Sequence, residues 1–339
     1  MTNWKKIFLL VIGILCVILL ICWQVFWART LQKQTRFLMD TYCTVQIYAN
    51  RGLAKRVLDK VFTRLEEIDK KFNVYRPGNE LYKFNQDGTP IEDREIVDLV
   101  KIALKVSEES SGAFDITIFP LMNLWGFPTR SGVTPHVPPQ KAISECLKKI
   151  GYKNLVIKNN VLSSTRKGIG VDLGGIAKGY AADEVVKILK LMGIKSALID
   201  LGGNIYAMGK HKGKPWKVGI KNPFGEGVIG VFEASDLSLV TSGVYERFFM
   251  ENGMRYHHIM DPKTGYPSKG LESVTVICSV STIADAWSTA LFVLGPERGL
   301  KLAENKPDME CIMVTPKSEI ICSRRLKEKL EIIKKQKRR

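Results

Sequence analysis

An unbroken apolar run near the N-terminus is the feature that most constrains how this chain can fold. Residues 7–27 read IFLLVIGILCVILLICWQVFW, a stretch of 21 residues in which Gln24 is the one strongly polar side chain. A helix of about 20 apolar residues is long enough to cross a bilayer. Trp4, Trp23 and Trp27 lie near the ends of the run, where indole rings favour the membrane interface. We therefore predict a transmembrane anchor at 7–27, with the rest of the chain folding outside the bilayer.

Two other kinds of N-terminal segment compete with an uncleaved anchor. A cleaved signal peptide has an apolar core of ~7–15 residues followed by a small-x-small cleavage site, and this longer run is followed by no such site. Lipidation of Cys16 or Cys22 is disfavoured, because a bulky Leu or Ile precedes each cysteine. The uncleaved anchor is the favoured interpretation. Basic residues flank the run on both sides, and we expect the main domain on the extracytoplasmic side of the membrane.

Composition suits a folded domain and argues against two classes of site. Of the seven cysteines, five lie outside the apolar run and form no Cys-x-x-Cys pair, so neither a zinc site nor a disulfide framework is favoured. The net charge is +17, and residues 324–339 contribute nine basic and two acidic side chains to it. A basic tail could contact nucleic acid, but water or anionic lipid explains it more simply on an anchored protein. We expect no nucleic-acid partner.

Hydrophobic periodicity after the anchor predicts a mixture of helices and hairpins. The stretch TYCTVQIYA from Thr41 alternates like a strand, and residues 51–73 place apolar side chains on one helical face. A further helix is expected at 92–110, and Asn252-Gly253 supplies the positive φ angles of a tight hairpin turn. Such a mixture favours an α+β fold over a regular βαβ wind. We therefore predict one α+β domain of mixed, largely antiparallel sheets with packed helices.

The stretch GVDLGGIAKGYAADE, residues 170–184, reads as a strand that ends on Asp172, breaks at two glycines and restarts as a helix with Lys178 in its first turn. The overlapping string GIGVDLG, residues 168–174, has the spacing Gly-x-Gly-x-x-x-Gly, one residue too long for the dinucleotide fingerprint, and the chain has no P-loop. Asp172 could simply cap the helix while Lys178 faces solvent. Two consecutive glycines are better explained by something that approaches the backbone closely. VDLGGIA recurs as IDLGGNI at Ile199, either by duplication of a strand-and-turn unit or independently.

A second constellation lies in STIADAWSTALF, at the start of a helix that is expected to end at Gly295. Asp285 and Thr289 are four residues apart, so on a helix their oxygens project from one face, one turn apart. Hard oxygen ligands of this kind suit Mg²⁺, which keeps several waters and often bridges substrate phosphates. Thr282 and Asp285 also have the spacing of a capping box, in which the acid only closes the helix start. Thr289 in mid-helix favours the metal site.

Two further stretches carry groups with both structural and chemical uses. In HHIMDPKTGYP the adjacent His257 and His258 point to opposite sides of a strand, so one of them could enter a cleft as a base. A histidine on a strand is more often structural. The apolar stretch SGAFDITIFPLMNLWGF around Asp115 is either core or a wall for a flat ring system, on which Tyr75 could stack.

Taken together, five strings between about Phe37 and Pro316 resemble the motifs of the ApbE-like FAD:protein FMN transferases: LMDTYCTV, FDITIFPLMNLWGF, DLGGIAKGYAAD, HIMDPKTGYP and ADAWSTALFVLG. The resemblance implies an enzyme that cuts FAD at its pyrophosphate. FMN is then joined through a phosphoester to a Thr or Ser hydroxyl of an acceptor protein, and AMP is released. It also implies a single-pass protein of the bacterial inner membrane, whose acceptor is a subunit of a membrane redox complex.

The resemblance also assigns roles to individual residues. His258 is expected to take the proton of the acceptor hydroxyl. One departure from the family pattern is Met39-Asp40-Thr41 in place of Met-Gly-Thr, and the turn is expected to persist because Asp tolerates positive φ. The residues implied to line the FAD site are Met39, Tyr75, Ala113, Phe114, Asp115, Asp172, Lys178, His258 and Ile259. Those implied to hold Mg²⁺ are Asp285, Thr289 and, through its backbone carbonyl, Gly175.

These expectations divide the chain and leave two rival functions open. An FAD pyrophosphatase on the same fold would pass the FMN phosphate to water instead of an acceptor. A non-catalytic FAD-binding envelope protein would keep the pocket without turnover, which Asp285, Thr289 and His258 together disfavour. The expected segments are a short tail at 1–6, the anchor at 7–27, a juxtamembrane linker at 28–36, the transferase domain at 37–323 and a basic tail at 324–339.

Overall fold

A computed structural model describes residue 4 and residues 7–8, 11–17, 29–127, 132–326 and 330–332. Within these ranges, no helix is both long and apolar enough to cross a bilayer. Residues 9–10 and 18–27 of the predicted anchor lie outside the described residues, so the anchor stays a prediction.

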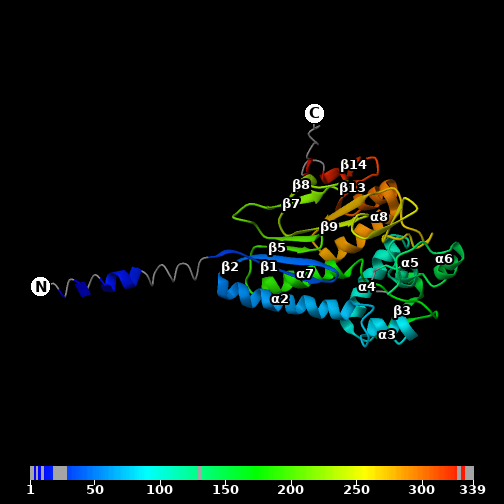
Figure 1. Ribbon diagram of the computed structural model, residues 1–339, viewed down its shortest axis with the longest axis horizontal. Helices are drawn as coiled ribbons and strands as arrows, with labels where there is room; N and C mark the ends of the chain where they lie inside the picture. Colours follow the sequence, from blue (N-terminus) through cyan, green and yellow to red (C-terminus); the bar gives the residue numbers. More distant parts are fainter. Residues whose placement is uncertain are drawn as a thin grey trace.

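An eight-stranded sheet forms the centre of the fold (Figure 1). Neighbouring strands pair antiparallel throughout, in the order β1-β2-β5-β6-β9-β12-β13-β14. The prediction of an α+β fold with largely antiparallel sheets is confirmed. The strands are β1 (Thr30–Leu38), β2 (Thr41–Ala49), β5 (Ala197–Leu201), β6 (Asn204–Met208), β9 (Leu237–Gly243), β12 (Ser273–Cys278), β13 (Glu310–Val314) and β14 (Ile320–Cys322).

Three helices pack against one face of this sheet: α2 (Arg51–Phe72), α7 (Ala177–Leu191) and α8 (Ser281–Glu304). Figure 1 shows α2 and α7 lying along the sheet. The predicted apolar stripe of α2 is buried, and Asn50 caps its start by accepting a hydrogen bond from the Leu53 N–H at 2.9 Å. Burying a large apolar side chain contributes about 1.5–3 kcal/mol. The main hydrophobic core lies between these helices and the sheet. The same packing brings the three helices close together.

A smaller sheet covers the opposite face. It contains β7 (Trp216–Lys221), β8 (Val228–Ala234) and β15 (Leu330–Ile332), in the order β15-β8-β7. Trp216 and Phe232 pack there with Leu239 of the main sheet, and Leu326 is fully buried in the same cluster. Residues 324–326 and 330–332 therefore form structure where the sequence predicted a basic tail, because alternating apolar residues there can add to an exposed sheet edge.

The remaining elements lie beside the sheet, around the end where the α2 helix finishes (Figure 1). In the hairpin of β10 and β11, Asn252 (φ 51°) and Gly253 (φ 74°) form the turn, as predicted. These elements are α3 (Glu80–Asp87), α4 (Arg94–Glu109), η1 (Ile116–Ile118), α5 (Phe119–Trp125), α6 (Gln140–Leu147), η3 (Tyr152–Asn154), β3 (Leu155–Lys158), β4 (Val161–Ser164), β10 (Phe248–Glu251) and β11 (Met254–His257). The short helix η4 (Arg324–Leu326) lies instead with the smaller sheet.

One predicted element boundary was wrong, and one was confirmed. Residues 30–36, assigned to a juxtamembrane linker, form most of β1, because every second side chain of this polar strand still faces the protein. The helical conformation of the last long helix stops at Gly295, as predicted. That glycine leaves the helical conformation (φ 78°, ψ 177°), but a second helical segment begins at once at Pro296 and runs on to Glu304, since proline is well suited to a first helical turn.

The two glycine-containing units have different structures. Gly202 (φ 66°) and Gly203 (φ 90°) join β5 to β6 as a hairpin turn, whereas Gly174 and Gly175 have no positive φ and lead into α7. The segment before Gly174 is also no strand, which corrects that prediction. The side chain of Asn85 takes the place of a strand partner, because it bonds both the N–H (2.6 Å) and the C=O (2.8 Å) of Val171.

Candidate active site

A cavity of about 300 Å³ lies where the end of α2, the start of α7 and the first turns of α8 converge. Side chains from distant parts of the chain, from Met39 to Thr289, meet at its surface. Every residue that the sequence assigned to the FAD and Mg²⁺ sites lines this one cavity: Met39, Tyr75, Ala113, Phe114, Asp115, Asp172, Gly175, Lys178, His258, Ile259, Asp285 and Thr289.

The turn between β1 and β2 forms one part of the cavity wall. Met39 (φ 53°) and Asp40 (φ 60°) both adopt positive φ, so the turn persists with Asp in place of Gly, as predicted. The turn packs tightly, because a Cβ atom on Gly202 would overlap the side chain of Thr41. A side chain on Gly202 would therefore displace Thr41, which lines the same cavity.

Asp172 and Lys178 lie at the start of α7. The Asp172 carboxylate accepts a hydrogen bond from the Gly174 N–H at 2.7 Å, and a Cβ on Gly174 would lie 2.9 Å from that oxygen. Burial raises the pKa of Asp172, while the Gly174 N–H and the charges of Arg247 and Lys178 oppose the rise. Lys178 lines the same cavity, close enough for its charge to act on Asp172.

Asp285, Thr289 and Gly175 lie together. Asp285 accepts a hydrogen bond from the Gly179 N–H at 2.8 Å, and Thr289 lies one turn further along α8. A Cβ placed on Gly175 would be 3.6 Å from the Thr289 hydroxyl. The Thr289 hydroxyl is also 3.3 Å from that of Ser242 on β9. One carboxylate, one hydroxyl and an adjacent backbone therefore share a small volume.

These oxygen donors fit Mg²⁺. In the part of the chain that the structure describes, no group of three or more His, Cys, Asp or Glu is arranged to hold a metal ion. Mg²⁺ does not need such a cage, because it usually binds one or two carboxylates and completes its octahedron with water and substrate phosphate. Asp285 with Thr289 and the Gly175 carbonyl is a donor set of this kind.

The capping-box alternative for Asp285 was wrong. Asp183 of α7 closes the start of α8 instead, because its carboxylate accepts hydrogen bonds from the Ser281 N–H (2.9 Å), the Thr282 N–H (2.8 Å) and the Thr282 hydroxyl (2.6 Å). Asp285 is therefore not needed as a cap, and its carboxylate faces the cavity.

The two adjacent histidines lie in different surroundings, as predicted, with His257 at the end of β11 and His258 just after it. His257 is buried, with Nε2 at 2.9 Å from the Ser268 carbonyl and Nδ1 accepting the Ile259 N–H at 3.2 Å. Burial lowers the pKa of His257 to about 4. His257 therefore serves the scaffold and fixes the backbone next to His258.

His258 enters the cavity and has one ring nitrogen free to act as a base. Its Nδ1 lies 3.1 Å from the Arg247 carbonyl, which can only accept, so Nδ1 carries the proton and Nε2 has the lone pair. Burial, followed by the charge of Arg247, lowers the pKa of His258 to about 3. The ring is half-buried, because the cavity opens to solvent beside it.

Asp115 and Tyr75 use their polar atoms within the scaffold. The Asp115 carboxylate accepts from the Thr117 N–H (2.8 Å), the Thr117 hydroxyl (2.6 Å) and the Tyr152 N–H (2.9 Å). Burial raises the pKa of Asp115, and these hydrogen bonds oppose the rise. The Tyr75 hydroxyl donates to the Asn123 side chain at 2.8 Å, which leaves its ring against the cavity. Phe114 lies beside Gly175 and supplies a flat apolar surface.

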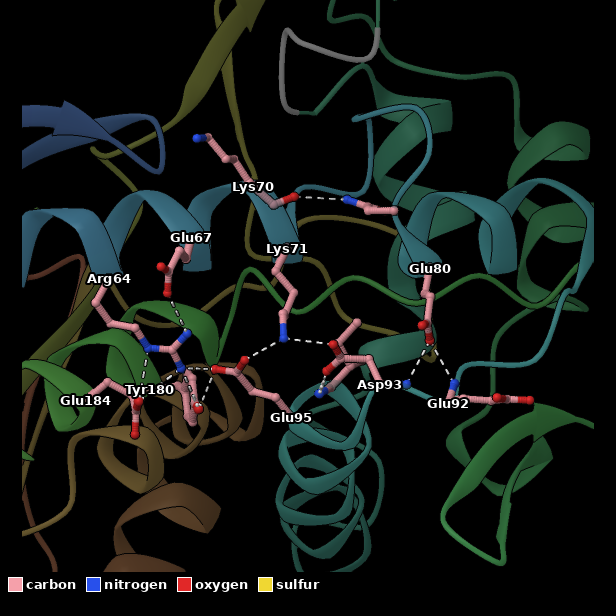
Figure 2. Close-up of polar contacts among 12 residues, drawn as sticks. Arg64, Glu67, Lys70, Lys71, Glu80, Glu92, Asp93, Glu95, Tyr180 and Glu184 are labelled. Atoms are coloured by element: carbon pink, nitrogen blue, oxygen red, sulfur yellow. Dashed lines mark hydrogen bonds and ion pairs between the residues drawn. The ribbon is translucent and has the colours of Figure 1, made fainter.

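A cluster of charged side chains joins the helices that carry the cavity walls (Figure 2). Arg64 of α2 contacts Glu95 of α4 and lies 2.9 Å from Glu184 of α7, while the Tyr180 hydroxyl donates to Glu95 at 2.6 Å. Lys71, near the end of α2, also pairs with Glu95 at 2.6 Å. Burial alone would raise the pKa of Glu95, but the bonds from Lys71, Tyr180 and Arg64 lower it below its ordinary value. This cluster fixes the end of α2 against the start of α7.

Comparison with known proteins decides the family. The model of the ApbE family matches residues 39–313. The chain belongs to the ApbE family. An FAD:protein FMN transferase of Treponema pallidum is 33% identical over 327 residues, 89% of each protein. One from Klebsiella pneumoniae is 34% identical over 296 residues, 84% of this chain and 90% of that protein.

Solved structures of ApbE proteins share the fold. The ApbE protein of Thermotoga maritima has a TM-score of 0.82 at 32% identity, over 88% of this chain and 99% of that one. The flavin transferase ApbE from Vibrio cholerae has a TM-score of 0.79 at 30% identity, with the same two coverages. The predicted resemblance is confirmed. The protein is a transferase, and its relatives are named for the transfer of FMN from FAD to protein.

Two residues were not predicted from the sequence: Arg247, which lines this ApbE cavity, and Gly179, which lies behind its wall. Gly179 lets α7 approach α8, but a glycine inside a helix gives no sign of its partner. Arg247 lines the cavity beside His258. A signal for Arg247 did exist, since a two-residue turn at 252–253 sets a register that pairs residue 247 with residue 258.

Proposed function

We propose that this protein transfers FMN from FAD to a Thr or Ser hydroxyl of an acceptor protein, in a reaction that depends on Mg²⁺ and releases AMP. The observation that carries the proposal is the single cavity, which is lined by a neutral histidine, a lysine at a helix start and a set of hard oxygen donors. Phe114 and Tyr75 offer flat surfaces for the isoalloxazine ring beside them.

The arrangement supports attack by an acceptor hydroxyl. His258 Nε2 accepts the hydroxyl proton, and the hydroxyl oxygen bonds to the FMN phosphorus while the bond from that phosphorus to AMP breaks. Lys178 and the N-terminal end of α7 stabilise negative charge on the pyrophosphate. Asp285, Thr289 and the Gly175 carbonyl would hold Mg²⁺, which when bound supplies further positive charge to the phosphates.

A transfer assay separates this function from its two rivals. The protein is incubated with FAD, Mg²⁺ and a flavin-carrying subunit of a membrane redox complex, and the acceptor is then denatured. Flavin fluorescence that stays on the denatured acceptor supports transfer. Release of free FMN without labelled acceptor supports the pyrophosphatase, and unchanged FAD supports a binding protein.

We also propose that an anchor at 7–27 holds the enzyme in the bacterial inner membrane, with the cavity on the extracytoplasmic side. The support is the length of the apolar run and the tryptophans near its ends. An enzyme in that position meets membrane-bound acceptors directly. Reporter fusions to residue 339 test the orientation, because a reporter active only in the cytoplasm should be silent there. Activity of that reporter would reverse the orientation.

A further inference from the structure

Arg247 lies opposite His258 at the base of the β10–β11 hairpin. The hairpin register pairs Phe248 with His257, so Arg247 faces His258 one step further from the turn. The backbone carbonyl of Arg247 accepts from both the His258 N–H and the His258 Nδ1–H, each at 3.1 Å. The backbone therefore fixes the two residues side by side, and the Arg247 side chain takes no part in that contact.

The side chain of Arg247 is an exposed cation that lines the cavity. Within residues 29–127 and 132–326 it forms no ion pair, and the neighbouring carboxylate of Glu246 lies 3.5 Å from Lys221 instead. The charge of Arg247 acts on two groups of the cavity. It lowers the pKa of Asp172, against the effect of burial, and it lowers the pKa of His258, in the same direction as burial. The cation is therefore available to a bound anion, which would share it with the Asp172 carboxylate of the same cavity.

Lys178 is a second cation of the same cavity, and it comes from a different element. It lies in the first turn of α7, and its charge acts on the same two groups, Asp172 and His258. Two cations from separate elements around one base match a ligand with two adjacent phosphates better than a ligand with a single charge. A guanidinium presents its donors as a planar fork, which suits the paired oxygens of a phosphate.

We propose that Arg247 binds the phosphate of FMN that is transferred, on the side where the acceptor hydroxyl arrives. This proposal rests on the proposed function and adds a phosphate-binding residue to it. The acceptor O–H gives its proton to His258 Nε2, and its oxygen forms the new bond to the FMN phosphorus. The bond from phosphorus to the bridging oxygen breaks, and its electron pair leaves with AMP. Arg247 holds the non-bridging oxygens of that phosphorus throughout.

The test uses three flavins that carry two, one and no phosphates: FAD, FMN and riboflavin. Binding of each is measured by fluorescence at constant Mg²⁺ with wild-type protein and with Arg247→Gln, Arg247→Lys and Lys263→Gln. Lys263 is an exposed lysine on the nearby turn that does not line the cavity, so its replacement matches the change in charge. Arg247→Gln should weaken the binding of FAD and of FMN at least about tenfold, and the binding of riboflavin less than about twofold. Arg247→Lys should fall between, and Lys263→Gln should match wild type.

Two results would overturn the proposal. Equal weakening of riboflavin and FAD by Arg247→Gln would make Arg247 a structural residue, and unchanged FAD and FMN binding would exclude a phosphate contact. Single-turnover transfer at saturating FAD should also slow at least about tenfold in Arg247→Gln. If the wild-type protein transfers no FMN to an acceptor, the proposed function fails, whereas the binding series still decides whether Arg247 contacts phosphate.

Discussion

The carboxylate of Asp285 on α8 accepts a hydrogen bond of 2.8 Å from the backbone N–H of Gly179 on α7. This contact joins the helix that carries the proposed metal ligands to the helix that carries Lys178. The side chain of Asp285 therefore has two uses, one in helix packing and one in chemistry. Variants can separate them.

Asp285→Asn should keep the helix contact and lose the metal. The amide oxygen can still accept the Gly179 N–H, so the free energy of unfolding should change by less than about 1 kcal/mol. Transfer at a fixed Mg²⁺ concentration should fall at least about 100-fold, because the carboxylate charge is gone. Asp285→Ala should lose both the helix contact and the metal. It leaves the buried Gly179 N–H unpaired, which should lower the free energy of unfolding by about 1–3 kcal/mol. Thermal melts and Mg²⁺ titrations of transfer measure the two effects, and full activity of Asp285→Asn would contradict the metal assignment.

Gly179→Ala should separate α7 from α8. The new Cβ would lie 2.7 Å from the Asp285 Cβ and would overlap the Ser281 carbonyl. Overpacking of this kind costs about 1–3 kcal/mol, and transfer should fall with it because the ligand helix moves. Gly225→Ala is the control, since a methyl group on Gly225 would meet no atom within 4 Å and should change stability by less than about 0.5 kcal/mol. Denaturant unfolding measures the stability of both variants. Equal losses of stability would show that close packing of the two helices does not require glycine at 179.

His258→Ala should slow transfer at least about 100-fold while FAD binding changes much less. The pH profile gives an independent check. The pKa of His258 lies near 3, below the ordinary value of 6.5, so the neutral base persists as pH falls from 7 and is lost only near 3. For wild type, kcat/KM should therefore show no loss centred on pH 6.5 between pH 5 and 8, since this ratio reports the free enzyme. Equal losses of binding and transfer in His258→Ala would make this residue a binding or structural one.

Arg64→Gln should destabilise the protein by about 2 kcal/mol, because it removes one partner from a partly buried charge cluster. The side chains of Arg64, Glu95 and Glu184 are 20%, 17% and 19% exposed, so water replaces the lost contacts poorly. Lys101→Gln is the matched control. The Lys101–Asp98 pair is about half exposed, and its loss should cost less than about 0.5 kcal/mol. Urea unfolding measures both variants, and a loss below about 0.5 kcal/mol for Arg64→Gln would remove the cluster as a stabilising element.

The sequence by itself determined the features that depend on short stretches of chain. The apolar spacing of α2 and the Asn252-Gly253 turn fixed a helix and a hairpin, because helix periodicity and turn conformation are local properties. The motifs also named twelve residues that the fold brings to one cavity. Of the two adjacent histidines, His257 is buried at the end of β11 and His258, just after it, lines the cavity.

Only the tertiary structure decided which hydrogen-bond partner each polar group has, because several partners of equal chemistry were available. Asp183 caps α8, which frees Asp285 for the cavity, and Asn85 replaces a strand partner for Val171. Each of these pairs is separated by more than 80 residues in the chain. A hydrogen-bond donor can bond to any suitable oxygen that packing places within reach, and sequence spacing gives no measure of that distance. Short sequence motifs therefore identified the residues of the site. Packing between distant segments determined which of their polar groups bond to the scaffold and which face the cavity.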